Sequence, residues 1–387
     1  MNSKKANDWT DYLEGDFRTE FIENIRSLSF DKIQKYPPPK KGGLPLGHET
    51  RIFRRFLSGK SSLLDLSIFS GLYLAVASKR QRLLHSIFVQ GEAAPKEDWG
   101  DLFGSKVIND WIENNLLKFS GDKIVSSFRL ISIDGIVLLV DPFPDPFPNR
   151  VHIGQDTLNL IEFLSLKQFS NKNLYLDVGT GSGAVLLTQN DKYKEAIGID
   201  INPRALRLSK LNIELNQKTF CKIYKQDALT LNDNYGLFDL ITWNVPFIFF
   251  PEDQKESNID GYGGDMGIEL TLKFVERIPT LLAEDGSCYL LSSAPILSNG
   301  HNVMVEQITS LAKRLELDIE VFPLQSFWMP NLKNFYKKHN IDRFESIILK
   351  IIIGNGTIKI NSLSVMESIT DRIRRVLYGF RPLGPLQ

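Results

Sequence analysis

The sequence predicts an α/β fold: a mainly parallel sheet in the second half, preceded by a separate, mostly helical α+β unit. Three observations support this prediction. From residue 174 onward, short apolar runs alternate with helical stretches, the pattern of a parallel sheet with helices on both faces. A glycine-rich turn at 179–183 follows the first of these runs. Prolines at alternate positions between 142 and 148 keep the backbone extended and mark a boundary between the halves.

The length and composition suit two globular domains in one chain. The chain has 387 residues, of which 42% are hydrophobic and 24% charged, so each half can bury a core. Lysine plus arginine equals aspartate plus glutamate at 46 each, and this zero net charge disfavours nucleic acid as a partner. The N-terminus is polar and no run of about 18 apolar residues occurs, so we expect a cytoplasmic protein without a membrane span.

The two cysteines, Cys221 and Cys288, lie in apolar runs. Neither belongs to a spacing typical of metal ligands. We therefore expect buried, reduced thiols and no metal site.

The first predicted unit, residues 1–148, is mostly helical. Apolar residues at helical spacing predict one helix around Phe17–Ile25 and a second over Leu63–Leu84, with a proline- and glycine-rich loop at 36–43 between them. A third helix is predicted over Val107–Leu117.

Two short strands, Ile124–Leu130 and Gly135–Val140, flank an Asp134-Gly135 turn and predict a hairpin near 124–140. Helices followed by a hairpin fit a plain α+β substrate-recognition domain, which we favour, and also a small winged-helix-like unit.

The second predicted unit spans residues 149–355. Residues 356–387 are expected to be either a C-terminal tail or a closing helix at Val365–Leu377. The predicted strands of the 149–355 unit are Leu174–Val178, Ala196–Asp200, Cys221–Lys225, Phe238–Trp243, Ser287–Leu291, Ile319–Phe322 and Ser346–Ile352.

A glycine-rich turn leaves the first of these strands with the sequence Asp177-Val178-Gly179-Thr180-Gly181-Ser182-Gly183. In a doubly wound fold this turn lies at the carboxyl edge of the sheet, where ligands bind. The three glycines allow a sharp turn and a close approach of a ligand to main-chain amides. Alone, such a loop also fits nicotinamide-dinucleotide folds and structural turns.

Polar side chains end the next three strands as well. Asp200 lies twenty-three positions after Asp177 and is placed to accept hydrogen bonds from both hydroxyls of a ribose. Asp227 follows the third strand within reach of an adenine amino group, and Asn244 follows the fourth. Each carboxylate taken singly also fits a helix cap. Together, these strand ends indicate a bound adenosine.

The run from Leu174 to about Leu291 resembles a class I S-adenosylmethionine-dependent methyltransferase domain, and in particular the HemK/PrmC-like amino-methylating group with its Asn-Pro-Pro-Tyr/Phe signature. The segment Gly261–Glu269 is similar to a glycine-rich segment of that group. The resemblance implies a Rossmann-like seven-stranded sheet whose last strand is antiparallel. It also implies S-adenosyl-L-methionine as cofactor, bound by Asp177, Gly179, Thr180, Gly181, Gly183, Asp200, Ile201, Asp227, Ala228 and Asn244.

The counterpart of the signature is Asn244-Val245-Pro246-Phe247. Methyl transfer requires alignment and desolvation, and a planar nitrogen also needs acceptors for its N–H bonds because its lone pair is delocalised. We expect the Asn244 side chain and the Val245 carbonyl to be these acceptors, Pro246 to stiffen the turn, and Phe247 to offer an aromatic face to a flat substrate group. Val245 stands where the family has its first proline.

The methyl acceptor itself is not identified by the sequence. We expect a nitrogen, amide or exocyclic amine, on a protein, small molecule or peptide rather than on nucleic acid. A methyltransferase of specialised metabolism that acts on oxygen, carbon or an amine is the alternative, since the same domain supports those nucleophiles. A binding module without catalysis is a remote third. The oligomeric state is not predicted.

Overall fold

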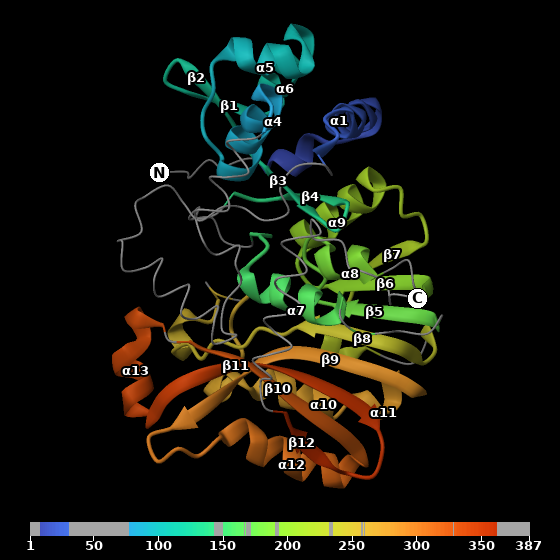
Figure 1. Ribbon diagram of the computed structural model, residues 1–387, viewed down its shortest axis with the longest axis vertical. Coiled ribbons are helices and arrows are strands. Elements are labelled where there is room, and N and C mark those ends of the chain that lie inside the picture. The colour runs from blue at the N-terminus through green and yellow to red at the C-terminus, as the bar shows by residue number, and fades with distance from the viewer. Residues whose placement is uncertain are drawn as a thin grey trace.

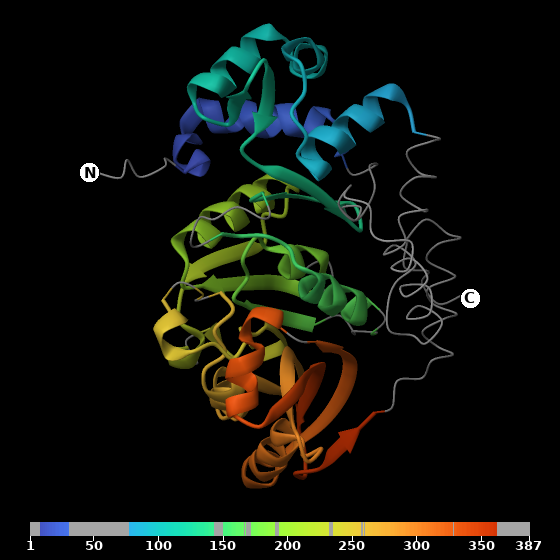
Figure 2. The same cartoon turned by 90° about the vertical axis from the view of Figure 1, so that its left-hand side faces the viewer.

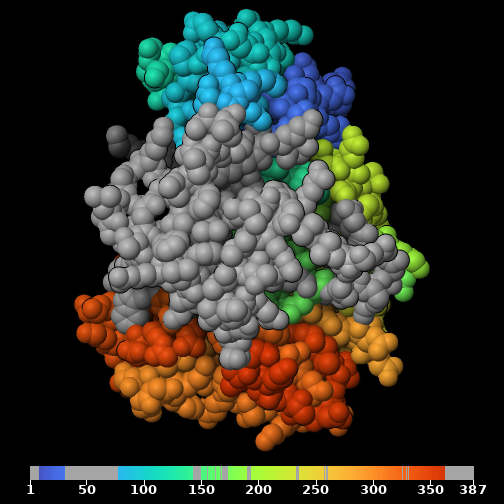
Figure 3. All heavy atoms as spheres, viewed as in Figure 1, coloured from blue at the N-terminus to red at the C-terminus, as the bar shows by residue number. Residues whose placement is uncertain are grey.

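The computed structural model describes residues 8–30, 77–142 and 150–361, without 166, 168–171, 190–192, 232–234, 257, 259 and 328. Figure 1 shows the N-terminal helices at one end of the molecule, strands β5–β8 in the middle and β9–β12 at the other end, and Figure 3 shows the same order on the surface. The loop predicted at 36–43, the proline run after Pro142 and the helix predicted at Val365–Leu377 lie outside the described residues, as does most of Leu63–Leu84.

The N-terminal unit is built on an aromatic core. Its helical segments are η1 (Trp9–Tyr12), α1 (Gly15–Ser27), α4 (Lys79–Leu84), η4 (His85–Gln90), α5 (Lys96–Phe103) and α6 (Ser105–Glu113). As predicted, α1 buries Phe21, Ile22 and Ile25. The helix predicted to reach Leu117 ends at Glu113 instead, because Asn115 adopts a positive φ of 58° and Leu117 begins a strand.

The hairpin predicted near 124–140 is two hairpins. Strands β1 (Leu117–Ser120) and β2 (Lys123–Ser126) form the first, and Ala94 bridges Ile124 at its edge. Strands β3 (Arg129–Ile133) and β4 (Ile136–Val140) form the second, with positive φ at both Asp134 and Gly135, as a two-residue hairpin turn requires. The predicted strand 124–130 is therefore divided between β2 and β3. In chain order, α5 and α6 are followed by the β1–β2 hairpin, whereas the β3–β4 hairpin lies against α9 (Figure 1).

The main sheet has eight strands in the order β12-β10-β11-β9-β8-β5-β6-β7. Their bounds are β5 (Lys172–Val178), β6 (Tyr193–Asp200), β7 (Cys221–Lys225), β8 (Phe238–Asn244), β9 (Leu282–Leu297), β10 (Leu317–Phe327), β11 (Ile341–Ile353) and β12 (Ile358–Ile360). All seven predicted strands form, and the last of them, β11, is antiparallel to both neighbours. The expected total of seven is wrong, because the chain turns back after β11 and adds β12 to the edge of β10.

Helices cover both faces of this sheet. On one face lie α7 (Gln155–Ser165), α8 (Ala184–Gln189) and α9 (Pro203–Leu215), and on the other α10 (Glu269–Val275), α11 (Ile278–Leu281) and α12 (Val303–Leu315) (Figures 1 and 2). A last helix, α13 (Lys333–Lys338), lies between β10 and β11. Over the described ranges, no helix has the length and apolarity needed to cross a bilayer.

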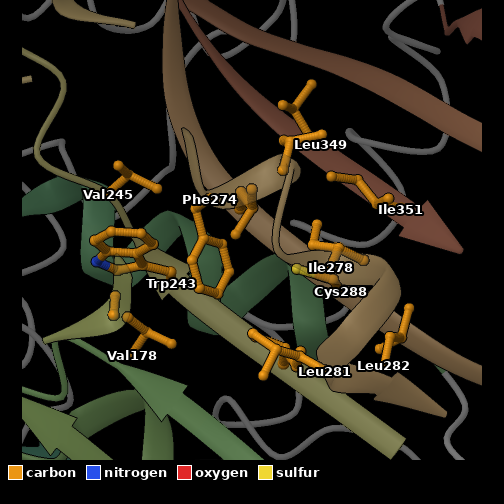
Figure 4. Close-up of a cluster of buried hydrophobic side chains, with 14 of the residues drawn as sticks. Val178, Trp243, Val245, Phe274, Ile278, Leu281, Leu282, Cys288, Leu349 and Ile351 are labelled. Atoms are coloured by element: carbon orange, nitrogen blue, oxygen red, sulfur yellow. The ribbon is translucent and has the colours of Figure 1, made fainter. Parts of the chain in front are cut away.

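The core between the sheet and α10–α11 contains Trp243, Phe274, Ile278 and Cys288 (Figure 4). Cys221 and Cys288 are both buried, as expected from their apolar surroundings, and neither is part of a disulfide.

Candidate active site

The glycine-rich loop connects β5 to α8 at the carboxyl edge of the sheet. Gly179, Gly181 and Gly183 have φ values of +57°, +56° and +80°, which only glycine adopts readily. A Cβ on Gly179 would lie 2.9 Å from Trp243 Nε1, so this position also requires a residue without a side chain. The loop is closed by the Gly183 amide, which donates to the Thr180 carbonyl at 2.7 Å.

Asp177 is buried beneath this loop with 2% of its surface exposed. Its two carboxyl oxygens accept hydrogen bonds from the hydroxyls of Thr180 and Thr242, each at 2.8 Å. Burial nevertheless dominates and raises the pKa of Asp177 to about 7, because a carboxylate is poorly solvated in the interior. No cation among the described residues pairs with this group.

Asp200, at the end of β6, lies against the same loop. One of its carboxyl oxygens accepts from the Gly181 amide at 3.0 Å and the other from the Asn202 amide at 2.8 Å. Burial raises the pKa of Asp200 as well. The next residue, Ile201, is 52% exposed beside these polar groups.

Asp227 caps a short turn after β7. Its carboxylate accepts from the Leu229 amide at 2.9 Å and so begins the turn η6 (Ala228–Thr230), in which Ala228 is buried. The Gln226 amide donates to the Asp200 carbonyl at 3.2 Å, which joins this turn to the end of β6. Arg277 also donates hydrogen bonds to the Leu229 carbonyl, at 2.7 Å, and to the Leu231 carbonyl.

Asn244 ends β8 on the other side of the loop. Its side-chain nitrogen donates to Thr157 Oγ1 at 3.1 Å. Its side-chain oxygen, Oδ1, is buried and has no hydrogen-bond partner in the described part of the chain. Buried polar atoms without partners are rare, so this oxygen marks a position that a ligand donor would complete.

The three residues that follow Asn244 fix the loop to the core. The Val245 amide donates to the Leu291 carbonyl of β9 at 3.0 Å, and its side chain is buried near Trp243 and Phe274 (Figure 4). Pro246 is half-buried, whereas Phe247 is buried and packs edge-on against Phe327. This differs from the open aromatic face expected of Phe247, because hydrophobic burial of the ring is the stronger driving force.

The segment Gly261–Glu269 packs backbone to backbone against this loop. The Ile248 amide donates to the Gly261 carbonyl at 2.7 Å, and the Gly263 amide donates back to the Ile248 carbonyl at 3.0 Å. A Cβ on Gly267 would lie 2.4 Å from the Phe247 carbonyl oxygen. Glycine at 267 therefore permits an approach that the 244–247 loop needs.

Sequence reasoning missed Thr157 and Thr242 as members of the site. Thr242 lies opposite Asp177 in the paired strands β5 and β8, so only the register of the sheet places it there. Thr157 lies in α7, which begins at Gln155. Val151 also lies beside the loop, since its side chain is 3.8 Å from the position of a Cβ on Gly181. Burial lowers the pKa of His152.

Comparison with known proteins identifies the second half of the chain. The methyltransferase domain family matches residues 170–323. A provisionally named protein N5-glutamine methyltransferase from Methanocaldococcus jannaschii is 29% identical over 195 residues, which cover 49% of this chain and 90% of that protein. The release factor glutamine methyltransferase of Lactococcus lactis is 28% identical over 145 residues, 35% of this chain and 53% of that enzyme. The chain thus spans about half the length of the lactococcal enzyme.

Among solved structures, the ribosomal protein L11 methylase of Lactobacillus delbrueckii is similar with a TM-score of 0.35 and 16% identity, over 52% of this chain and 81% of that one. From the domain match and the sequence relatives, the chain is an S-adenosylmethionine-dependent methyltransferase.

Proposed function

We propose that this methyltransferase acts on nitrogen, and that its acceptor is the side-chain amide of a glutamine in a protein. The Asn244 side chain carries the proposal: Oδ1 is buried without a partner among the described residues, while Thr157 holds Nδ2. Leaving a buried acceptor unpaired costs about 1–3 kcal/mol, a cost that is removed when a substrate N–H binds there. The names of the two sequence relatives, both glutamine methyltransferases, support an amide as the acceptor.

We assign the methionine part of the cofactor to the loop over Asp177. The buried carboxylate suits the cationic amino group of the methionine part, because no protein cation in the described residues neutralises it. The positive φ values of Gly179, Gly181 and Gly183 leave the main chain accessible to a ligand, and Thr180 holds Asp177 in place.

We assign the adenosine part of the cofactor to the ends of the next two strands, β6 and β7. Each Asp200 oxygen has a lone pair left after its main-chain hydrogen bond, which suits the ribose hydroxyls. The exposed side chain of Ile201 suits one face of the adenine, and Asp227 and Ala228 suit its edge. The residue types at this edge therefore fit S-adenosylmethionine.

When bound, S-adenosylmethionine supplies an electrophilic methyl group. An amide nitrogen is a poor nucleophile because its lone pair is delocalised into the carbonyl. The two N–H groups of the glutamine amide donate hydrogen bonds to Asn244 Oδ1 and to the Val245 carbonyl. These bonds favour a pyramidal nitrogen and stabilise its developing positive charge. Pro246 restricts the loop, and the buried Phe247 ring anchors it.

The test is transfer of a radiolabelled methyl group by the full chain in a host extract, separated into protein, RNA and small molecules. We expect label in protein, and mass spectrometry of the digest should find one added methyl group on a glutamine, with a translation release factor as the first candidate. Label only in small molecules would contradict the proposal and support an enzyme of specialised metabolism. Label only in RNA would contradict it as well.

A matched variant tests Asn244 itself. Asn244→Ala should bind S-adenosylhomocysteine in calorimetry within a few-fold of the parent chain, yet lose roughly a hundred-fold or more in turnover, as expected for removal of an acceptor used in the transition state. Unchanged turnover would remove Asn244 from the mechanism.

A further inference from the structure

Asn212 of α9 and Asn216, the residue that follows the last turn of α9, take the place of a neighbouring strand along the outer edge of β4. The Val137 amide donates to Asn216 Oδ1 at 2.9 Å, and Asn216 Nδ2 donates to the Val137 carbonyl at 2.7 Å. Asn212 makes the same pair of bonds to Leu139, at 2.7 and 3.0 Å. Positions four apart on a helix are about 6 Å apart, close to the roughly 6.8 Å between alternate strand residues, so the two spacings match.

The hairpin is also fixed where β4 ends. Asp141 accepts from Arg204 Nε near the start of α9 at 2.7 Å and from Trp9 Nε1 at 3.2 Å. Arg204, Asn212 and Asn216 thus bind Asp141, Leu139 and Val137 in turn, and β4 runs beside α9 along the length of that helix (Figure 1). The N-terminal unit is therefore attached to α9, the helix that follows Asp200.

Asn212 differs from Asn216 in one further contact. The second hydrogen of Asn212 Nδ2 is donated to the Ser182 carbonyl at 2.8 Å, and the Asn212 side chain is fully buried. The same peptide group carries the Gly183 amide, which donates to Thr180 at 2.7 Å. Because a peptide group is planar, these two bonds together fix the orientation of the Ser182–Gly183 peptide.

We propose that Asn212 is a positioning residue that couples the cofactor loop to the β3–β4 hairpin. The hydrogen bond from Asn212 to the Ser182 carbonyl keeps the Thr180–Gly183 turn in its closed form. Because Asn212 is also bound to Leu139, the closed form of the turn depends on the docked hairpin. Cofactor binding then stabilises the hairpin, and docking of the hairpin raises cofactor affinity by the same factor. The inference rests on the proposed placement of the cofactor over Asp177–Gly183.

Hydrogen exchange on the unmodified full chain, with and without S-adenosylhomocysteine, tests the coupling. At a ligand concentration of about 100 times Kd, amides that open only when the ligand is released exchange up to about 100-fold more slowly. We expect this slowing at Gly181–Gly183 and at Leu139, and a much smaller one at Val137, whose partner Asn216 hydrogen-bonds to Val137 and Asn212 rather than to the loop. Slowing at the loop but not at Leu139 would overturn the coupling. Slowing at neither would overturn the cofactor placement itself.

Asn212→Ala and Asn216→Ala form a matched pair, since each removes both bonds to one residue of β4. Both variants should unfold at lower temperature than the parent chain. Only Asn212→Ala should raise the Kd for S-adenosylhomocysteine, on the order of ten-fold, the equivalent of one hydrogen bond. Equal Kd values for the two variants would refute the role of Asn212. If Asn212→Ala does not fold, the exchange experiment on the unmodified chain decides.

Discussion

Thr242 and Asp177 lie opposite each other on the paired strands β8 and β5, and the Thr242 hydroxyl donates to the Asp177 carboxylate at 2.8 Å. Tyr175 Oη lies 2.7 Å from the same hydroxyl, so Thr242 is hydrogen-bonded on both sides within the sheet. These bonds hold the carboxyl group in one orientation beneath the glycine loop. Its pKa of about 7 places its titration near neutral pH.

We expect the affinity for S-adenosylhomocysteine to fall as the pH falls below about 7. The amino group of the ligand pairs with the charged form of Asp177, and below its pKa each pH unit leaves about ten-fold less of that form. Calorimetry from pH 5.5 to 8 should therefore show Kd rising up to ten-fold per unit on the acidic side. A Kd that does not change over this range would contradict the assignment.

Asp177→Asn should separate binding from stability. Because burial raises the pKa of Asp177, the folded chain without ligand favours the protonated carboxyl, and the free energy of unfolding declines as pH rises from about 4 to about 7. The asparagine variant carries no such charge, so at pH 8 we expect a higher melting temperature than the parent chain together with weak ligand binding. A lower melting temperature at pH 8 would show that the charged form is not destabilising.

Thr157→Val should lower kcat about ten-fold, the equivalent of one hydrogen bond, because the Asn244 amide then loses the bond that orients it. Thr157→Ser keeps the hydroxyl and should retain most of the activity. The measurement is kcat beside the S-adenosylhomocysteine Kd, which should change less than kcat. Equal activity of the valine and serine variants would exclude a role for the hydroxyl.

Val245→Pro restores the family's usual residue but removes the amide that donates to the buried Leu291 carbonyl. Leaving that carbonyl unpaired costs about 1–3 kcal/mol, offset by about 0.4–1 kcal/mol from the stiffer unfolded chain. Denaturant unfolding should therefore show a net loss of about 1 kcal/mol, with turnover retained because the residue 245 carbonyl remains. A more stable proline variant would show that this amide bond contributes little.

Gly267→Ala and Gly300→Ala compare two glycines with similar backbone angles, φ +74° and +84°. Alanine at positive φ costs about 1–2 kcal/mol at either position. A Cβ at 267 would also lie 2.4 Å from the Phe247 carbonyl oxygen, whereas one at 300 has nothing within 4 Å. We expect a larger loss of stability and a loss of turnover only for Gly267→Ala, measured by denaturant unfolding and methyl transfer. Equal losses for both variants would show that the 263–267 segment does not support the catalytic loop.

Where the local pattern is strong, the sequence predicts the fold well. The run Cys221–Lys225 is β7 to the residue, and the Asp134-Gly135 turn lies where its composition indicates. The strand predicted at 124–130 is wrong because the chain bends at Ser127 and Phe128, between β2 and β3, and periodicity alone does not reveal this break. The division of the chain near residue 148 and the recognition role of its first part stay predictions.

By itself, the sequence determined which residues stand at the ends of the strands: Asp177, Asp200, Asp227 and Asn244 follow apolar runs, and parallel strands bring their carboxyl ends to one edge. Only the tertiary structure decided what each side chain does there. Thr157 reaches Asn244, Thr242 reaches Asp177, and Asn212 joins Leu139 to Ser182 across intervals of 87, 65, 73 and 30 residues. Hydrogen bonds act over about 3 Å, so such partners are set by sheet register and helix docking rather than by local sequence.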